Sequence, residues 1–366
     1  MAITMCFICT SCGNAGKDNK TATEKQPLIE NEVETILPTG NGIYPICIEG
    51  KYGFINSNGQ IVINPQFDWA DTLSEGLAAV VIEKKWGYID STGSYVIRPQ
   101  FDYAYSFTEG MAGVNILDDI TRQGQWTFIN KDGEMLTSPK FNDVAGFSEE
   151  LAVVVDRGDY CYIDKNAKAI FWTNNDIAYD FSEGLACVRK SENRWDNQCG
   201  YINKKWQWVV QPQYLDAYDF SDGMARVMNE NHLWGYIDTE GNMIIAPQFS
   251  ESGAFSEGLA FVKKGDAVYC INKTGQVIFT PKIDDAAPFS EGLARVRAND
   301  KYGFMDKTGK LVIDANLDYA DDFSRELAKV RNGDKEGYIN KNGIWIFEVT
   351  ESERWRPRGH FEETYY

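Results

Sequence analysis

Three cysteines near the N-terminus, Cys6, Cys9 and Cys12, have the spacing that iron–sulfur and metal sites use for their thiolates. A complete site needs a fourth ligand, and no further thiol follows at a suitable distance. The sequence has only two histidines, His232 and His360. These are too few to make multi-histidine metal sites or Ser-His-Asp triads expected. We therefore expect no metal site, no cofactor and no histidine-based catalysis.

The same segment has a second interpretation. The letters "CTSCGN" are similar to the end of a bacterial lipoprotein signal, in which the cysteine that follows small residues is lipidated. Residues 1–12 would then be a truncated signal, Cys12 the lipidated residue, and residues 13–40 a flexible tether to the cell envelope. No Lys or Arg precedes Cys12, so the alternative is an unstructured tail on a cytoplasmic protein.

Carboxylates are the other residues that could do chemistry, since a pair of them can hydrolyse a glycosidic bond. The chain has 54 Asp and Glu residues, but the recurring ones occupy turn positions. Asp90 and Gly93, for example, bracket a tight turn whose loop lacks the alternating oxygen ligands of a calcium site. We expect no catalytic residue, with a carboxylate-based glycoside-acting enzyme or accessory module as the alternative.

Charge and composition restrict the classes of partner that the protein is expected to bind. A formal net charge of −18 repels phosphate backbones, so nucleic acid is not an expected partner. No apolar run is long enough to span a bilayer, which leaves a lipid anchor as the expected membrane contact. Hydrophobic residues at 43% suffice for a buried core, and we expect a monomer.

The elements that hold these residues form an internal repeat of about 34 residues. Its clearest signature is "FSEGLA", followed by a strand in which Ala and Val share one face and a variable third residue faces solvent. Arg226, Arg295 and Lys329 occupy that third position. The copies of the signature begin at Leu73, Phe107, Phe147, Phe181, Phe220, Phe255, Phe289 and Phe323.

A second signature, "WGYIDSTG" at residues 86–93 and its relatives, predicts another strand and a hairpin turn closed by Asp or Asn. A β-branched third strand then ends at a proline. An Asp or Asn such as Asp102 precedes the next "FSEGLA", and we expect it to cap a short helical turn. Glu150 and Glu326 replace the glycine of "SEG", which suggests that positive φ is not required there.

These signals predict an all-β protein made of antiparallel three-stranded units with one short helical turn each. Residues 41–345 would hold eight to nine units, and residues 346–366 a C-terminal cap or tail. Stacked units bury what a single unit cannot, which favours an open twisted β-solenoid. A closed ring similar to a β-propeller is the alternative.

The pattern "KWGYID" with "PQFD" and "FSEGLA" resembles the WG-repeat family of bacterial proteins over about residues 41–345. The resemblance implies a tandem β-repeat and carries over no catalytic residue. We therefore expect a non-enzymatic scaffold that presents an extended binding surface to a protein or cell-surface carbohydrate partner.

Contact residues should be those that differ between copies, because the shared letters build the frame. Trp69, Trp172, Trp206 and Trp208 have no aromatic counterpart in most copies and could stack on sugars or anchor a protein. The competing interpretation is that they fill local gaps in the core. Two further cysteines, Cys187 and Cys199, flank one predicted hairpin and could form a disulfide.

Overall fold

The computed structural model describes residues 42–117, 124–174, 176–190 and 198–354. All of them lie in one compact unit, Leu37–Tyr366. Across the described residues the regular elements are β-strands, and no helix there is long and apolar enough to cross a membrane. The expected sites at residues 1–12, including Cys12, and the expected tether at 13–40 lie outside the described residues.

The strands form nine separate antiparallel sheets within the described ranges, and we number these sheets as blades 1 to 9 in chain order. Blades 1 to 3 contain β1 (Ile43–Ile48), β2 (Lys51–Asn56) and β3 (Ile61–Phe67); β4 (Trp69–Ala70), β5 (Leu77–Ile82), β6 (Lys85–Asp90) and β7 (Tyr95–Phe101); β8 (Tyr103–Ala104), β9 (Met111–Leu117) and β10 (Gly124–Asn130). Blades 4 to 6 contain β11 (Asp143–Val144), β12 (Leu151–Asp156), β13 (Asp159–Asp164) and β14 (Ala169–Trp172); β15 (Ile177–Ser182), β16 (Leu185–Arg189), β17 (Cys199–Asn203) and β18 (Trp208–Tyr214); β19 (Asp216–Ala217), β20 (Met224–Met228), β21 (Trp234–Asp238) and β22 (Met243–Phe249). Blades 7 to 9 contain β23 (Glu251–Ser252), β24 (Leu259–Lys264), β25 (Ala267–Asn272) and β26 (Val277–Phe279); β27 (Asp285–Ser290), β28 (Leu293–Ala298), β29 (Lys301–Asp306) and β30 (Leu311–Leu317); β31 (Tyr319–Ala320), β32 (Leu327–Asn332), β33 (Lys335–Asn340) and β34 (Trp345–Thr350).

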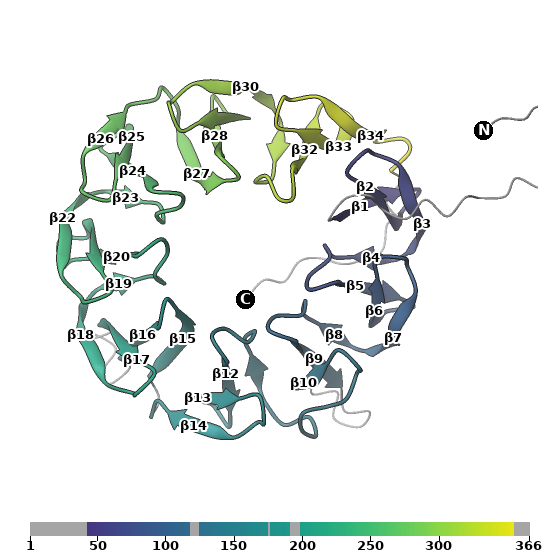
Figure 1. Ribbon diagram of the computed structural model, residues 1–366, viewed down its shortest axis with the longest axis horizontal. Helices are drawn as coiled ribbons and strands as arrows, with labels where there is room; N and C mark the ends of the chain where they lie inside the picture. Colours follow the sequence, from purple (N-terminus) through teal and green to yellow (C-terminus); the bar gives the residue numbers. More distant parts are fainter. Residues whose placement is uncertain (1–41, 118–123, 175, 191–197, 355–366) are drawn as a thin grey trace, which may run out of the picture. The chain divides into compact units, whose positions relative to one another are not determined.

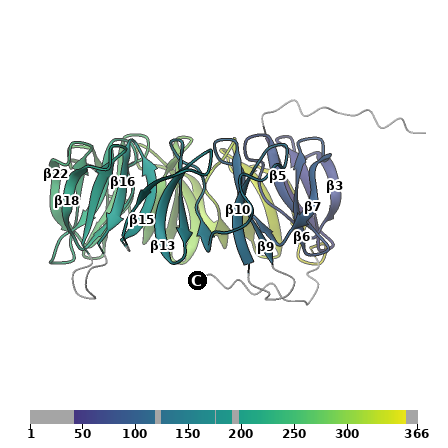
Figure 2. The same cartoon turned by 90° about the horizontal axis from the view of Figure 1, so that it is seen from below.

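The nine sheets form a closed ring, so the protein is a nine-bladed β-propeller (Figure 1). Seven blades have four strands in sequence order, and blades 1 and 3 have three. In Figure 1 the last strand of a blade, such as β18 or β22, lies at the outer rim. Seen from the side, the blades stand next to one another as a band of steep strands (Figure 2).

The expectation of an open solenoid of three-stranded units with a helical turn is therefore wrong, and the closed ring is correct. The segment taken for a helical turn holds the first strand of blades 2 to 9, which is only two residues long in six of them. Asp102 precedes this strand, but its carboxylate accepts the backbone N–H of Leu117 at 2.9 Å, in the hairpin of its own blade. Asp102 therefore caps a hairpin, and the prediction that it caps a helical turn is wrong.

Contacts between blades 9 and 1 close the ring. The hydroxyl of Tyr338 donates to the carbonyl of Pro45 at 2.8 Å, and the ring of Tyr338 lies 5.4 Å from that of Tyr44. At internal junctions the equivalent tyrosine reaches a different strand: Tyr88 of blade 2 donates at 2.7 Å to the carbonyl of Tyr105, which follows the first strand of blade 3. Blade 9 therefore contacts blade 1 through β1, the counterpart of the second strand in the other blades.

The core lies between the blades. One cluster joins Phe54 and Phe67 of blade 1 to Ala78 and Val80 of blade 2, and each of these side chains is at most 1% exposed. Each buried phenylalanine contributes about 2 kcal/mol before entropy is subtracted. The alanine of "LA" is buried where the neighbouring blade approaches, as the sequence predicted.

The prediction that the third residue of this strand faces solvent is wrong. Its counterparts Ala79, Val153, Cys187 and Phe261 are buried at 5% exposure or less, and Arg226 is half-buried. In a ring of blades each sheet has a neighbour on both faces, so both sides of the strand are covered.

The turns between strands three and four follow the predicted Asp/Asn chemistry. The carboxylate of Asp90 accepts the backbone N–H groups of Thr92 at 2.9 Å and Ser94 at 3.1 Å, and Gly93 has φ of 86°. The prolines were expected to end the third strand of the unit. Instead Pro65 and Pro99 lie inside β3 and β7, the rim strands, where a missing donor is tolerated at a sheet edge.

The glycine of the "WG" pair makes room for this rim strand. A Cβ built at Gly87 would lie 2.6 Å from both the carbonyl oxygen of Ile97 and the nitrogen of Pro99, which is too close for any side chain. The pairing of β6 with β7 shifts register here, between Trp86 and Tyr88. Glycine is therefore required by a close backbone approach at a β-bulge.

Candidate functional site

The antiparallel order gives the ring two faces. Turns between strands one and two and between strands three and four lie on one face, which we call the ladder face. Hairpins between strands two and three and the connections from blade to blade lie on the other, which we call the hairpin face. Both faces place polar or aromatic side chains next to each other from successive blades.

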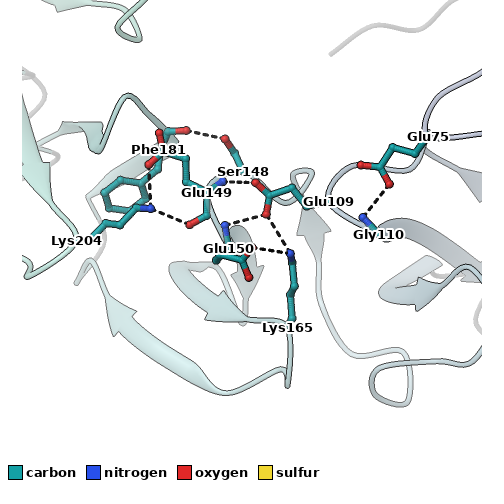
Figure 3. A network of polar contacts seen from close by, with 9 residues as sticks. All are labelled: Glu75, Glu109, Gly110, Ser148, Glu149, Glu150, Lys165, Phe181 and Lys204. Carbon is teal, nitrogen blue, oxygen red and sulfur yellow. Dashed lines mark hydrogen bonds and ion pairs between the residues drawn. The ribbon is translucent and has the colours of Figure 1, made fainter.

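The ladder face carries a row of acids, one from each Ser-Glu-Gly turn, that we call the carboxylate ladder. Each acid accepts a backbone N–H from the corresponding turn of the next blade. Glu75 accepts from Gly110 at 2.9 Å, and Glu109 accepts from Glu149 at 2.5 Å and from Glu150 at 2.8 Å (Figure 3). The ladder consists of Glu75, Glu109, Glu149, Glu183, Asp222, Glu257 and Glu291.

Lysines neutralise most of these acids. Lys165 lies 3.2 Å from Glu109, and Lys204 lies 3.0 Å from Glu149 (Figure 3). Burial tends to raise the pKa of Glu109, but hydrogen bonds from backbone N–H groups and from Lys165 outweigh it and lower the pKa. Because each ladder acid accepts a backbone N–H from the next blade, the ladder holds blades together and its carboxylates are engaged in structural contacts.

The turns themselves require left-handed backbone at both central residues. Glu75 and Gly76 have φ of 49° and 89°, the signature of a type I′ turn. Glu150 and Glu326, which replace the glycine, keep φ of 75° and 80°. The expectation that positive φ is not needed there is wrong, because the turn geometry persists and the residue adopts it.

The hairpin face of blades 1 to 3 carries a cluster of aromatic rings that we call the aromatic surface. Five of its members lie in the first three residues of a strand that starts on this face, and the sixth, Tyr105, directly follows β8. Trp69 and Tyr103 are each 45% exposed and Tyr105 is 37% exposed. The surface consists of Tyr52, Trp69, Trp86, Tyr103, Tyr105 and Trp126.

Ring contacts connect the three blades. Tyr52 of blade 1 lies 5.0 Å from Trp69 of blade 2, and Trp86 of blade 2 lies 4.9 Å from Tyr103 of blade 3. Within blade 3, Tyr105 stacks on Trp126 at 4.7 Å and 7°. Each pair fixes its rings against one another, which reduces the entropy lost when a partner binds.

One acid belongs to this surface. The indole nitrogen of Trp69 donates to the carboxylate of Asp71 at 2.9 Å. Burial raises the pKa of Asp71, and the hydrogen bond from Trp69 offsets part of that increase. The hydrogen bond orients the indole, so its exposed face has a defined direction.

The four predicted tryptophans are not brought together. Trp69 belongs to the aromatic surface, and Trp172, 41% exposed, ends β14 at the rim of blade 4. Trp206 stacks on Phe171 at 4.6 Å, and Trp208 packs with it against the core between blades 4 and 5. For these last two, the packing matches the alternative that they fill local gaps.

The remaining candidates from the sequence are the cysteines and histidines, and their contacts are those of structural residues. Cys187 and Cys199 are buried free cysteines, and a hydrogen bond between the two thiols raises the pKa of Cys187. His232 lies in a tight turn with φ of 58°, while His360 lies outside the described residues. In the described part of the chain, no three His, Cys, Asp or Glu side chains are placed to hold a metal ion.

Sequence reasoning found one member of the aromatic surface and missed five. The missed rings stand at positions that the repeat itself fills with aromatics, such as Trp86, and were treated as frame. A usable signal was present: an aromatic at the first position of the short strand, as in Trp69 and Tyr103, sits 17 residues after the "WG" aromatic that it contacts.

Comparison with known proteins adds the family and the fold. The family model described as "WG containing repeat" matches eight segments: residues 52–86, 86–118, 126–160, 176–195, 200–231, 234–266, 270–302 and 302–335. A search among curated proteins finds no match to the sequence.

Among solved structures, a eukaryotic initiation factor aligns with a TM-score of 0.63 and 11% identity, covering 87% of this chain and 100% of that one. BamB from Moraxella catarrhalis aligns with a TM-score of 0.42 and 11% identity, covering 87% and 98%. At such identities only the fold is shared, and only the first alignment is close enough to support it.

Proposed function

Because the chain belongs to the family of WG containing repeats and its repeats build a β-propeller scaffold, we propose that it is a non-enzymatic binding protein. The observation that carries this proposal is the aromatic surface. Two groups of rings lie on the hairpin face of three successive blades, Tyr52 with Trp69 and Trp86 with the three rings of blade 3, and Trp69, Tyr103 and Tyr105 are substantially exposed. Tyrosine and tryptophan anchor most protein interfaces because each contributes a large apolar area at low entropic cost.

A protein partner fits this surface better than a carbohydrate. The rings come from three blades, so the surface suits the footprint of a protein segment more than that of one or two sugar units. Tyr105 and Trp126 already stack face to face, so this pair presents a fixed apolar surface rather than two open rings for sugars. The net charge of −18 additionally favours partners that are basic around their contact site.

The competing function, glycoside hydrolysis, needs two carboxylates whose pKa values are pushed apart. Burial raises the pKa of Asp180 to about 6 and also raises that of its neighbour Asp219. Asp180 and Asp219 each lie beside another acid, and neither has a lysine or arginine ion pair among the described contacts that would hold one of them ionised as a nucleophile or base. This pattern favours binding over hydrolysis.

Site-directed photo-cross-linking tests the proposal. A benzoylphenylalanine in place of Tyr103 should form protein adducts in cells that make this protein, because Tyr103 would lie inside the interface. The matched control is the same residue in place of Tyr95, which is 37% exposed but lies in the rim strand β7.

Adducts at position 103 that are absent at position 95, and that disappear when Trp69 is changed to alanine, would support the proposal. Adducts that glycosidases remove would assign the surface to a carbohydrate instead. Equal labelling at both positions, or labelling of neither, would show that the aromatic surface is not the binding site.

A further inference from the structure

One arginine in the ring lacks the partner that its repeat equivalent has. Arg226 in β20 is half-buried, and its guanidinium carbon lies 3.7 Å above the ring of Tyr218. One terminal nitrogen donates to the carbonyl of Ser252, but Nε is buried without a hydrogen-bond partner. Among the described residues, no carboxylate lies within 4.0 Å of this guanidinium.

Arg295 shows what the partner should be. It occupies the same place in blade 8, since Arg295 pairs with Phe304 across its hairpin as Arg226 pairs with Tyr236. The Nε of Arg295 donates to the carboxylate of Asp322 in blade 9 at 2.9 Å. An arginine at this position can therefore form an ion pair with an acid from the next blade.

In blade 7 that acid is missing. The backbone N–H of Gly253 donates to the carbonyl of Phe261 at 2.8 Å, just as that of Asp321 donates to Lys329 at 2.8 Å. These equivalent bonds align the two short strands, so Ala254 stands where blade 9 has Asp322. The methyl group of Ala254 leaves the position of a carboxylate empty of polar atoms.

A pocket occupies this place. It has a volume of about 260 Å³, and its lining includes Arg226, Ala254, Phe261 and Pro288. Apolar side chains thus line part of the space beside a guanidinium that has no ion pair among the described contacts. A ligand with a carboxylate and a small apolar body would match both parts of the lining.

The other charges at the pocket do not neutralise Arg226. Lys263 also lines it, 2.7 Å from Glu251 and 3.8 Å from Asp285, so both of these acids are directed to the lysine. Asp219 of the same blade is near enough for Arg226 to lower its pKa, although burial raises that pKa overall. Asp219 forms no ion pair with Arg226 within the described contacts.

The geometry points to a binding site for a small organic acid at the junction of blades 6 and 7, in which the carboxylate of the ligand binds Arg226 in the place that Asp322 fills at the junction of blades 8 and 9. The site is independent of the aromatic surface and of any partner that binds there. Bidentate contact with a carboxylate is the strongest hydrogen-bonding mode of arginine, so the charge would dominate recognition.

Calorimetric titration of the whole protein with butyrate, and with butyramide as its uncharged match, tests the site. Butyrate should bind at least about tenfold more tightly than butyramide, because only the carboxylate pairs with the guanidinium. Arg226→Gln should reduce butyrate affinity by about the same factor.

Ala254→Asp is the sharper variant. It should supply the missing acid from within the chain, raise the melting temperature and abolish butyrate binding. Ala287→Asp is the control, because it adds the same charge in blade 8, one residue before Pro288, the counterpart of Ala254, and next to a blade that has Phe261 at the arginine position; it should not raise the melting temperature.

Equal affinity for butyrate and butyramide would overturn the proposal, as would the absence of butyrate binding up to about 10 mM. Should Ala254→Asp fail to fold, Ala254→Asn keeps the shape of the added group without its charge, and the titration of Arg226→Gln still decides. Retention of butyrate binding by both folded variants would place the ligand elsewhere.

Discussion

At the residue scale, the second central position of each Ser-Glu-Gly turn adopts left-handed backbone whichever residue stands there. Gly184 has φ of 83°, and Glu150 at the same place in blade 4 has φ of 75°. A residue with a Cβ is about 1 kcal/mol less stable in this conformation than glycine. Blades 4 and 9 therefore tolerate a strained residue at a point where the other blades have none.

Glu150→Gly should stabilise the protein by about 1 kcal/mol. The variant loses the ion pair with Lys165, but the side chain of Glu150 is 77% exposed and such a pair contributes little. Urea-induced unfolding measures the change, with Gly184→Ala as the opposite control. A less stable Glu150→Gly protein would show that the glutamate does more than occupy the turn.

The glycine of the "WG" pair is required for a different reason, the space that the rim strand needs. Six copies keep it, at Gly53, Gly87, Gly200, Gly235, Gly303 and Gly337. The other copies have Thr127, Cys161 and Tyr269, and their fourth strand is absent as a named strand or shortened to β14 or β26. A side chain at this position and a full rim strand exclude one another.

Gly87→Ala should therefore destabilise blade 2 by about 3 kcal/mol, because its Cβ would overlap the backbone of Ile97 and Pro99. Cys161→Ala is the matched control at the same repeat position and should cost about 1 kcal/mol, since a Cβ is already accommodated there. Equal losses in denaturant unfolding would contradict the close-approach explanation.

At the element scale, the turns act as connectors between blades. Each turn donates its backbone N–H to the carboxylate of the previous blade, and its serine usually donates to the next one, as Ser74 does to the carbonyl of Phe107 at 2.8 Å. Hydrogen bonds in both directions make the turn row continuous from blade 2 to blade 9 on the ladder face. The turn sequence thus serves the junction as much as the hairpin.

Acid should weaken the ladder. Burial tends to raise the pKa of Glu75, Glu109 and Glu149, but hydrogen bonds from backbone N–H groups and lysines lower each pKa below the ordinary value of 4.5. A carboxyl group whose pKa is lower in the folded state stabilises the fold above its unfolded pKa, and this stability is lost as pH falls through the folded pKa. The contribution of the ladder to the unfolding free energy should therefore be constant from neutral pH down to about pH 5 and decrease below it.

Glu109→Gln, measured over the same pH range, should be less stable at neutral pH and should depend less steeply on acid. An identical pH dependence of the variant and the unmodified protein would mean that the ladder is not the source of the acid sensitivity.

The strands and their turns could be predicted from sequence because their causes are local. The Asp/Asn position, its glycine and the alternation around "LA" all act within one hairpin. The short first strand could not be predicted this way, because Asp102 with a following alanine looks the same before a helical turn as before a strand. Its true partner, the N–H of Leu117, lies in the hairpin of the same blade.

The aromatic surface was less predictable, because side-chain exposure also depends on contacts outside a single repeat. Trp206 occupies a glycine position and looked exceptional, yet it packs on Phe171. Tyr103 looked ordinary, yet it is exposed beside Trp86 and Trp126. Exposure depends on how neighbouring blades meet, and the letters of a single repeat do not contain that information.

At the scale of the whole molecule, closure depends on the angle between successive blades, summed over nine of them. The repeat sequence predicts the strands of one unit but not the angle between neighbouring units. An open array and a closed ring are therefore both compatible with the repeat. Contacts between residues far apart in the sequence establish the ring. The hydroxyl of Tyr338 donates to the carbonyl of Pro45, and the backbone N–H of Glu49 donates to the carbonyl of Glu353 at 2.7 Å.

Pulsed electron resonance between two spin labels tests closure most directly. Glu49, Asp300 and Asp334 are exposed and lie in the same hairpin of blades 1, 8 and 9. Labels would replace these residues in a background in which Cys6, Cys9, Cys12 and Cys47 are serine. The pair at 49 and 334 should give the same short distance as the adjacent-blade pair at 300 and 334. A 49–334 distance far beyond that of the adjacent pair would show that the array is open and would contradict the propeller.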